Sequence, residues 1–311
     1  MHRRSFIKQK AMLAASIGLG ATQLSAAGKS FFEVKNNSFN LNYAPHLGMF
    51  KNLAGDDPID QLNFMADQGF TAFEDNGMKM RTPELQEKMA KTMTERNIQM
   101  GVFVAHEIFW KEPNLTNGDQ SLRTKFLKEI EESVVVAKRV NAKWVTVVPG
   151  HVDLQINPAT QSVNVIESLK RACEILEPHG IIMVLEPLNF RDHPGQFLTE
   201  SPQAHAICKA VNSPSCKILF DLYHQQIQEG NLIPNIDAFW DEIAYFQVGD
   251  NPGRKEPTTG EINYENVFKH IYSKGFKGIL GMEHGNSLEG KEGEMAVLEA
   301  YRKSDSFKLV H

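Results

Sequence analysis

The hydrophobic and polar positions along the chain follow two alternating patterns. Short runs rich in β-branched, aliphatic and aromatic residues predict β-strands. Longer amphipathic segments between them, several opened by proline or by a Ser/Thr cap, predict helices. The expected strands are Phe39–Tyr43, Thr71–Glu74, Gln99–Val104, Trp144–Val148, Ile181–Leu185, Lys217–Phe220, Ala244–Val248 and Gly278–Met282. Helical patterns include Pro83–Arg96, Ser121–Val140, Pro158–Glu177 and Ser201–Val211.

Eight strands alternating with helices predict an α/β fold of the (β/α)₈ TIM-barrel type. No proline-rich linker or low-complexity tract interrupts the pattern, so residues 28–311 are expected to form a single domain. A doubly wound sheet is the alternative, but it lacks its usual marker because no G-x-G-x-x-G follows the first predicted strand. No fixed-period repeat of the solenoid kind occurs.

The N-terminus carries a different pattern. The segment HRRSFIKQK (His2–Lys10) is followed by a weakly apolar run, Ala11–Leu24, and by the small residues Ser25–Ala27. It resembles a twin-arginine export signal, with Arg3 and Arg4 as the arginine pair. The apolar run is shorter than the ~20 residues that a membrane-spanning helix needs.

Residues 1–27 are therefore expected to be a signal peptide, and the mature chain would begin near Gly28. The resemblance implies a periplasmic or otherwise exported protein with no stable membrane insertion after cleavage.

Composition narrows the class of partner. The 311 residues are 41% hydrophobic, which allows a large core, and the formal net charge is −5. Basic residues do not cluster outside the extreme N-terminus, so we expect a small-molecule partner and no nucleic acid. Cys173, Cys208 and Cys216 lack CxxC spacing and are expected to be small buried side chains. The sequence allows either a monomer or a homo-oligomer.

Polar residues stand at the ends of the last four predicted strands. Glu186, Asp221, Gln247 and Glu283 each terminate or closely follow an apolar run. Neighbouring strands of a barrel lie ~5 Å apart, so these side chains should converge on one rim. Three carboxylates that close repel one another unless a cation neutralises them. Carboxylate and amide oxygens suit Mg²⁺ or Mn²⁺ best, and Zn²⁺ is not excluded.

Three motifs around these residues resemble one family closely. They are LEPLN (Leu185–Asn189), FDLYHQQIQEGN (Phe220–Asn231) and FQVGDNPGRKEPTTGEINY (Phe246–Tyr264). These motifs are similar to those of the hydroxypyruvate isomerase family, within the wider xylose-isomerase-like barrels that also include ketose 3-epimerases. Epimerase relatives have histidine where this chain has Gln247, which favours the hydroxypyruvate isomerase branch.

The resemblance implies roles for individual residues. Glu186, Asp221, Gln247 and Glu283 would bind a divalent cation, and Glu186 and Glu283 would also act as acid and base. His224, three residues after Asp221, and Arg254, in NPGRKEP, would contact a keto-acid or sugar substrate.

The implied reaction is isomerisation of a small 2-hydroxycarbonyl compound through an enediolate, such as hydroxypyruvate to tartronate semialdehyde. A ketose 3-epimerase or a keto-sugar lyase would use the same groups. An exported metal-dependent sugar-binding protein is the non-enzymatic alternative. Endonuclease relatives of the barrel use a histidine-rich multi-zinc centre and basic loops, which the acidity of this chain disfavours.

Other residues near the predicted rim have two interpretations. A loop histidine either faces the pocket or forms structural hydrogen bonds, and this applies to His46, His106 and His151. Glu74, at the end of the second strand, is expected to hydrogen-bond behind the metal ligands. Phe109 and Trp110 either wall the pocket or pack beneath a loop, in a segment (Ala105–Gln120) expected to shape the substrate pocket.

Overall fold

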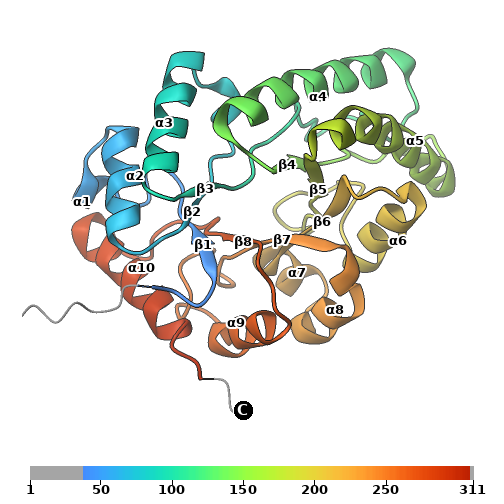
Figure 1. Cartoon of the computed structure of the whole chain (residues 1–311). Helices are drawn as coiled ribbons and strands as arrows, with labels where there is room; N and C mark the ends of the chain where they lie inside the picture. The colour runs from blue at the N-terminus through green and yellow to red at the C-terminus, as the bar shows by residue number, and fades with distance from the viewer. Residues whose placement is uncertain (1–37, 309–311) are drawn as a thin grey trace, which may run out of the picture. The chain divides into compact units, whose positions relative to one another are not determined.

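Short parallel strands curl around a central axis and helices surround them (Figure 1). The computed structural model describes residues 38–308. Within these residues the ladders form a six-stranded sheet, ordered β1-β8-β7-β6-β5-β4, and a two-stranded sheet, β2-β3. The strands are β1 (Asn42–Ala44), β2 (Ala72–Phe73), β3 (Gln99–Met100), β4 (Trp144–Val147), β5 (Ile182–Leu185), β6 (Cys216–Asp221), β7 (Ile243–Gln247) and β8 (Ile279–Gly281).

Two isolated parallel bridges join the sheets. His46 pairs with Glu74 beyond the ends of β1 and β2, and the Glu74 amide donates to the Pro45 carbonyl at 3.0 Å. Val104 pairs with Thr146 between the β3 segment and β4, where the Thr146 amide donates to the Phe103 carbonyl at 2.8 Å. The strand order therefore runs from β1 to β8 and back to β1, and the (β/α)₈ prediction is confirmed.

The helices alternate with the strands as the amphipathic pattern predicted. They are α1 (Lys51–Ala54), α2 (Pro58–Asp67), α3 (Pro83–Glu95), α4 (Gln120–Val140), α5 (Pro158–Leu176), α6 (Ser201–Val211), α7 (Leu222–Gln228), α8 (Leu232–Phe239), α9 (Tyr264–Ser273) and α10 (Gly290–Ser304), with 3₁₀ turns η1 (Met78–Met80), η2 (Glu177–His179) and η3 (Trp240–Glu242). Side-chain caps explain several starts: Thr82 accepts from the Leu85 amide, and Asn157 accepts from the Ala159 amide, each ahead of a proline.

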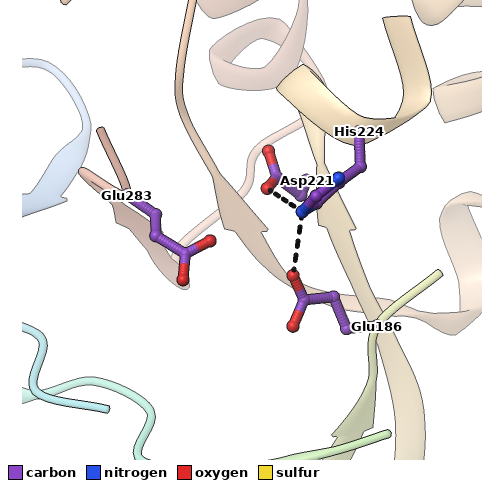
Figure 2. A group of neighbouring side chains, drawn as sticks. All are labelled: Glu186, Asp221, His224 and Glu283. Atoms are coloured by element: carbon purple, nitrogen blue, oxygen red, sulfur yellow. Dashed lines mark ion pairs between the residues drawn. The ribbon is translucent and has the colours of Figure 1, made fainter. Parts of the chain in front are cut away.

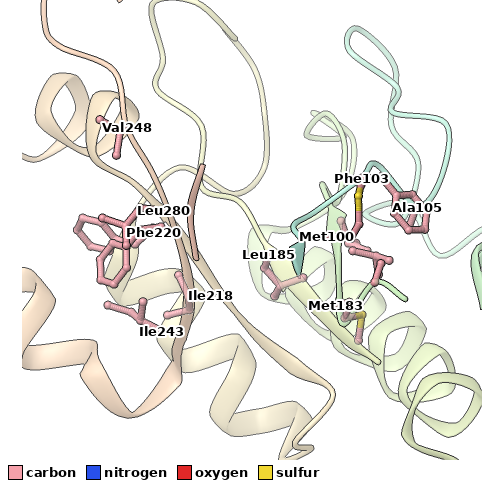
Figure 3. Close-up of a cluster of buried hydrophobic side chains, with 14 of the residues drawn as sticks. Met100, Phe103, Ala105, Met183, Leu185, Ile218, Phe220, Ile243, Val248 and Leu280 are labelled. Carbon is pink, nitrogen blue, oxygen red and sulfur yellow. The ribbon is translucent and has the colours of Figure 1, made fainter. Parts of the chain in front are cut away.

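The barrel interior is filled by one small cluster with a residue from each strand segment. Its buried members are Ala44, Ala72, Val102, Trp144, Val184, Leu219, Tyr245 and Ile279. The neighbouring positions along the strands point outward and pack beneath the helices. Figure 3 shows part of this second, larger cluster, including Met183, Leu185, Ile218 and Phe220. The period-2 alternation of strands thus assigns each strand residue to the interior or to the helix-facing layer.

The three cysteines are free and buried, as expected. The predicted export signal, residues 1–27, lies outside the described residues. In the part of the chain that the structure describes, no helix is long and apolar enough to cross a bilayer.

Candidate active site

The strand alternation carries three polar side chains to the top of the barrel. Glu186 lies two residues after the interior Val184, and Asp221 two after the interior Leu219. Gln247 follows Tyr245 in the same way, and it pairs in register with Asp221 on β6 and Gly281 on β8. These positions therefore point inward at the C-terminal ends of their strands, where barrels of this kind place their chemistry.

The predicted convergence of the carboxylates is observed. One ligand atom from each of Glu186, Asp221, His224 and Glu283 lies within 4.8 Å of the others, and the first three residues are buried. Figure 2 shows the Glu283 carboxyl group facing the Glu186 and Asp221 carboxyl groups from the opposite side. We call these four residues together with Gln247 the strand-end cluster.

His224, on the first turn of α7, is held in one orientation. Its Nε2 lies 3.4 Å from Asp221 Oδ2 and 3.6 Å from Glu186 Oε1. Its Nδ1 receives Nδ2 of Asn189 at 2.6 Å and the Asn189 backbone amide at 3.4 Å. Two donors at Nδ1 favour the tautomer with the ring proton on Nε2, where the Asp221 and Glu186 carboxylates can accept it, but Arg254 Nη2, which can only donate, also lies 3.3 Å from Nε2. The Nε2 side of His224 therefore faces the cluster and is placed to contact a substrate oxygen.

Burial, with Arg254 nearby, lowers the pKa of His224 to about 3. The ring is therefore neutral throughout the physiological pH range.

Arg254 supplies positive charge to the cluster. Its Nη2 donates to Glu283 Oε2 at 2.6 Å and to Asp221 Oδ2 at 3.3 Å, and its Nε donates to the Glu283 carbonyl at 3.2 Å. The guanidinium also lies 4.8 Å from the centroid of the Tyr223 ring. Burial alone would lower the pKa of Arg254, but the Glu283 and Asp221 carboxylates raise it above its usual value. Arg254, predicted to contact substrate, therefore pairs with the carboxylates of Glu283 and Asp221 in this structure.

Gln247 is oriented by a hydrogen bond from behind the site. Its Nε2 donates to Glu74 Oε1 at 2.9 Å, and Tyr245 donates its hydroxyl to Glu74 Oε2 at 2.7 Å. The Gln247 Oε1 atom is buried and has no hydrogen-bond partner. A buried carbonyl oxygen without a donor is unfavourable unless another group, such as a cation, completes its coordination. The hydrogen bond expected of Glu74 is therefore observed.

Two glycines make room for this network. A Cβ atom at Gly281 would lie 1.9 Å from Glu74 Oε2, and one at Gly101 would lie 2.4 Å from the Tyr245 hydroxyl. Burial, reinforced by the Glu283 charge, raises the pKa of Glu74 to about 8. The pKa of Glu186 is raised well above its usual value for the same reasons, burial first and then Glu283 and Asp221. Arg254 thus offsets only part of the repulsion.

The donor set fits a divalent cation. Three carboxylates that converge from different strands, an orphaned amide oxygen beside Asp221 and raised carboxyl pKa values all favour a bound positive charge. Glu186, Asp221, Gln247 and Glu283 are the residues that would hold the ion.

The three rim histidines form hydrogen bonds with the backbone. His46 bonds to the Leu47 carbonyl at 2.8 Å, and His151 bonds to the Val152 carbonyl at 2.8 Å. His106 bonds to the Glu107 carbonyl at 2.8 Å and also lines a cavity beside the site. His106 therefore combines the structural and the pocket interpretations.

The segment after β3 lies against the site, as expected. The Trp110 ring stacks on His193, with centroids 4.9 Å apart, and His193 contacts His224 edge-on at 5.4 Å. Phe109 packs under the Lys125 ammonium group, 5.2 Å from its ring centroid.

Sequence reasoning missed several residues that complete the site. Asn189 fixes the His224 ring, Asn76 donates to Glu283 Oε1 at 2.9 Å, and Tyr245 supports Glu74. Asn189 belongs to the LEPLN motif and could have been found there. Asn76 carries no local signal, because its contact joins residues 207 positions apart.

A family model described as a xylose isomerase-like TIM barrel matches residues 62–303. The chain belongs to this family.

Curated relatives carry isomerase names. Hydroxypyruvate isomerase of Escherichia coli (strain K12) is 31% identical over 160 residues, which cover 51% of this chain and 62% of the relative. A 2-oxo-tetronate isomerase of Pectobacterium atrosepticum is 26% identical over 239 residues, which cover 76% of this chain and 89% of the relative. The chain thus spans about three fifths of the hydroxypyruvate isomerase that it matches.

Solved structures share the fold. A Brucella melitensis protein described as a family 2 AP endonuclease has a TM-score of 0.72 and 24% identity, covering 81% of this chain and 96% of that one. The IolI protein, described with a bound zinc atom, has a TM-score of 0.68 and 17% identity, covering 85% of this chain and 98% of that one. At these identities the likeness concerns the fold alone.

Gly281→Ala tests the space behind the site. The added Cβ atom would displace the Glu74 carboxylate and should lower the free energy of unfolding by about 1–3 kcal/mol, as measured by urea denaturation. Gly77→Ala is the control, because its Cβ atom would meet only ordinary contacts at 3.5 Å. Equal stability of the Gly281→Ala variant and the wild type would contradict the packing described here.

Proposed function

We propose that this protein is a metal-dependent isomerase of a small 2-hydroxycarbonyl compound, of the hydroxypyruvate isomerase type. The observation that carries the proposal is the convergence of three carboxylates and an unpartnered amide oxygen at the C-terminal face of the barrel. The isomerase names of the relatives support it. The reference reaction is the conversion of hydroxypyruvate to tartronate semialdehyde.

The cation proposed for this site is Mg²⁺ or Mn²⁺, because its donors are hard oxygens. Zn²⁺ remains the alternative, supported by the zinc described in the IolI protein and by a histidine beside the carboxylates. A bound cation would polarise the carbonyl and hydroxyl oxygens of the substrate and lower the free energy of an enediolate.

The residues of the chain move the protons. Glu186 or Glu283 takes the proton from the hydroxyl-bearing carbon, the electron pair of that C–H bond forms the C=C bond of an enediolate, and the C=O π pair moves onto the carbonyl oxygen. A carboxyl group then returns a proton to the former carbonyl carbon, and the proton of the original hydroxyl group passes to the former carbonyl oxygen. The carbonyl is thereby moved to the neighbouring carbon. Glu186 and Glu283 face each other across the cluster, so both can reach one bound substrate (Figure 2). The Nε2 side of His224 is placed to contact a substrate oxygen during these steps.

A ketose 3-epimerase or a keto-sugar lyase would use the same groups, and Gln247 in place of histidine favours the isomerase. A sugar-binding protein without turnover would not require two opposed glutamates. A nucleic-acid substrate is disfavoured by the net charge of −5. The proposed partner is therefore a keto acid or a sugar, and a homo-oligomer remains compatible with it.

Metal binding should depend on pH. Raised carboxyl pKa values mean that the metal-free site retains protons at a pH where free carboxylic acids are ionised, so metal must displace them. The affinity of the site for metal should rise as pH increases through these pKa values, as measured by titration calorimetry with Mg²⁺ and Mn²⁺.

Bound metal should also stabilise the fold. At a free metal concentration of 100 Kd the free energy of unfolding should rise by about 2.7 kcal/mol.

Asp221→Ala should abolish this metal-dependent stabilisation, whereas Asp56→Ala, at an exposed position, should retain it. Activity that survives exhaustive chelation would refute metal dependence.

The two glutamates can be tested by Glu186→Gln and Glu283→Gln. Each variant preserves size and an oxygen ligand but removes the basic group, so kcat should fall by roughly two or more orders of magnitude while metal binding changes less. Glu95→Gln, whose side chain is 61% exposed on α3, should retain wild-type turnover. Near-normal rates in both cluster variants would exclude the two-carboxylate mechanism.

We also propose export of the chain through the twin-arginine pathway, from the pattern of residues 1–27. Replacing Arg3 and Arg4 with lysine should retain the precursor in the cytoplasm, as measured by cell fractionation and immunoblotting, because paired arginines are the defining element of that signal. Unchanged export of the double variant would contradict the proposal. A cytoplasmic marker protein followed in the same fractions is the control for clean fractionation.

A further inference from the structure

Thr146, on β4, points into the barrel. Its neighbours along the strand, Val145 and Val147, belong to the larger cluster that packs beneath the helices. Trp144, two residues before Thr146, belongs to the interior cluster. Because successive side chains of a strand point to opposite faces, the Thr146 hydroxyl lies on the interior side.

Thr146 occupies the position on β4 that three members of the strand-end cluster occupy on the next three strands. Each of these residues lies two positions after a member of the interior cluster, and they are Glu186, Asp221 and Gln247. Thr146 pairs in register with Val184, so Glu186 is the next inward residue beyond this pair on β5. The sheet order places β5 between β4 and β6. Thr146 therefore extends the inward polar layer by one strand, on the side of Glu186 away from Asp221.

The Thr146 hydroxyl is buried without a hydrogen-bond partner. The residue is 2% exposed, and its Oγ1 has no partner among the residues that the structure describes. Its backbone groups are both paired, since the amide donates to the Phe103 carbonyl at 2.8 Å and the carbonyl accepts from the Ala105 amide at 3.0 Å. A buried hydroxyl without a partner is unfavourable, and a valine of similar shape would avoid that cost. The stability of the barrel therefore does not account for the hydroxyl.

The unpartnered hydroxyl lies in a layer whose other polar groups belong to the site. Gln247 Oε1 is likewise buried without a partner, and it is one of the atoms proposed to hold the cation. Asp221 and His224 are as buried as Thr146, at 0% and 1% exposure, so this degree of burial is usual for residues of the strand-end cluster. A hydroxyl can donate to one oxygen and accept from another. A substrate oxygen on the β4 side of Glu186 would satisfy it.

We propose that Thr146 is a further substrate-contact residue, whose hydroxyl donates a hydrogen bond to an oxygen of the 2-hydroxycarbonyl group at the strand-end cluster. This inference rests on the proposed function and deepens it. The hydroxyl can donate to the carbonyl oxygen before reaction and to the enediolate oxygen formed from it. The second hydrogen bond is stronger because the acceptor has gained negative charge.

The stability of the metal-free protein is the first test. Thr146→Val removes an unpartnered hydroxyl and keeps the side-chain shape, so the urea midpoint should equal or exceed that of the wild type. Thr116→Val is the matched control, because the buried Thr116 hydroxyl donates to the His151 carbonyl at 2.8 Å. The Thr116→Val midpoint should fall. A lower midpoint for Thr146→Val would assign its hydroxyl a structural role and overturn the inference.

The second test measures the binding of glycolohydroxamate, a planar enediolate mimic that cannot isomerise, to the Mg²⁺-loaded protein by titration calorimetry. Thr146→Val should raise Kd about three- to tenfold, the loss expected for one hydrogen bond. Thr146→Ser keeps the hydroxyl and should stay within about twofold of the wild type. The Kd for Mg²⁺ alone should be unchanged in both variants, since Thr146 is not a proposed cation ligand. Unchanged analogue affinity in Thr146→Val, or equal losses in the two variants, would overturn the inference.

Binding and turnover separate the two proposals. Thr146-dependent binding of the analogue by a protein that isomerises no 2-hydroxycarbonyl compound would overturn the proposed function and retain the Thr146 contact. Hydroxypyruvate isomerisation with kcat lowered but analogue affinity unchanged in Thr146→Val would overturn the inference alone, because the hydroxyl would then act through Glu186.

Discussion

The repulsion between the carboxylates of Glu186, Asp221 and Glu283 is the constraint on which the rest of the site depends. Their ligand atoms lie within 4.8 Å of one another in a largely buried position, where charges interact strongly. Arg254 offsets part of this repulsion through Asp221 and Glu283. The raised pKa of Glu186 indicates that the compensation is incomplete, which is the condition under which a divalent cation binds well.

The barrel makes this arrangement possible by rigid placement. Strand alternation directs Glu186, Asp221 and Gln247 inward above a filled interior layer, so the Glu186 and Asp221 carboxylates cannot move apart without disturbing packed strands. Behind them, Glu74 and Tyr245 set the amide of Gln247 with its oxygen unpartnered. Gly281 is required for this arrangement, because the Glu74 carboxylate occupies the space that a side chain at position 281 would fill.

The periodicity of the chain by itself predicted the eight strands, the helices that correspond to α3, α4, α5 and α6, and the four strand-end positions. This was possible because a buried parallel strand is a local pattern, and barrel geometry then brings successive strand ends together. The helices Pro83–Glu95 and Ser201–Val211 fell within a residue of expectation because their caps are local too. The motif around Phe246–Tyr264 drew attention to Arg254, but its pairing with Asp221 and Glu283 emerged only from the fold.

Tertiary structure alone decided the contacts that join distant segments. Asn76 and Glu283, or Glu74 and Gln247, are far apart in sequence, and nothing in their local surroundings encodes the partner. The same holds for the rim histidines: sequence placed His46, His106 and His151 after strands, but only packing distinguished backbone hydrogen bonding from a place in the cavity lining. Side-chain direction and cavity shape depend on the simultaneous packing of many segments. Periodicity therefore predicts where each strand ends but not which side chains its terminal residues contact.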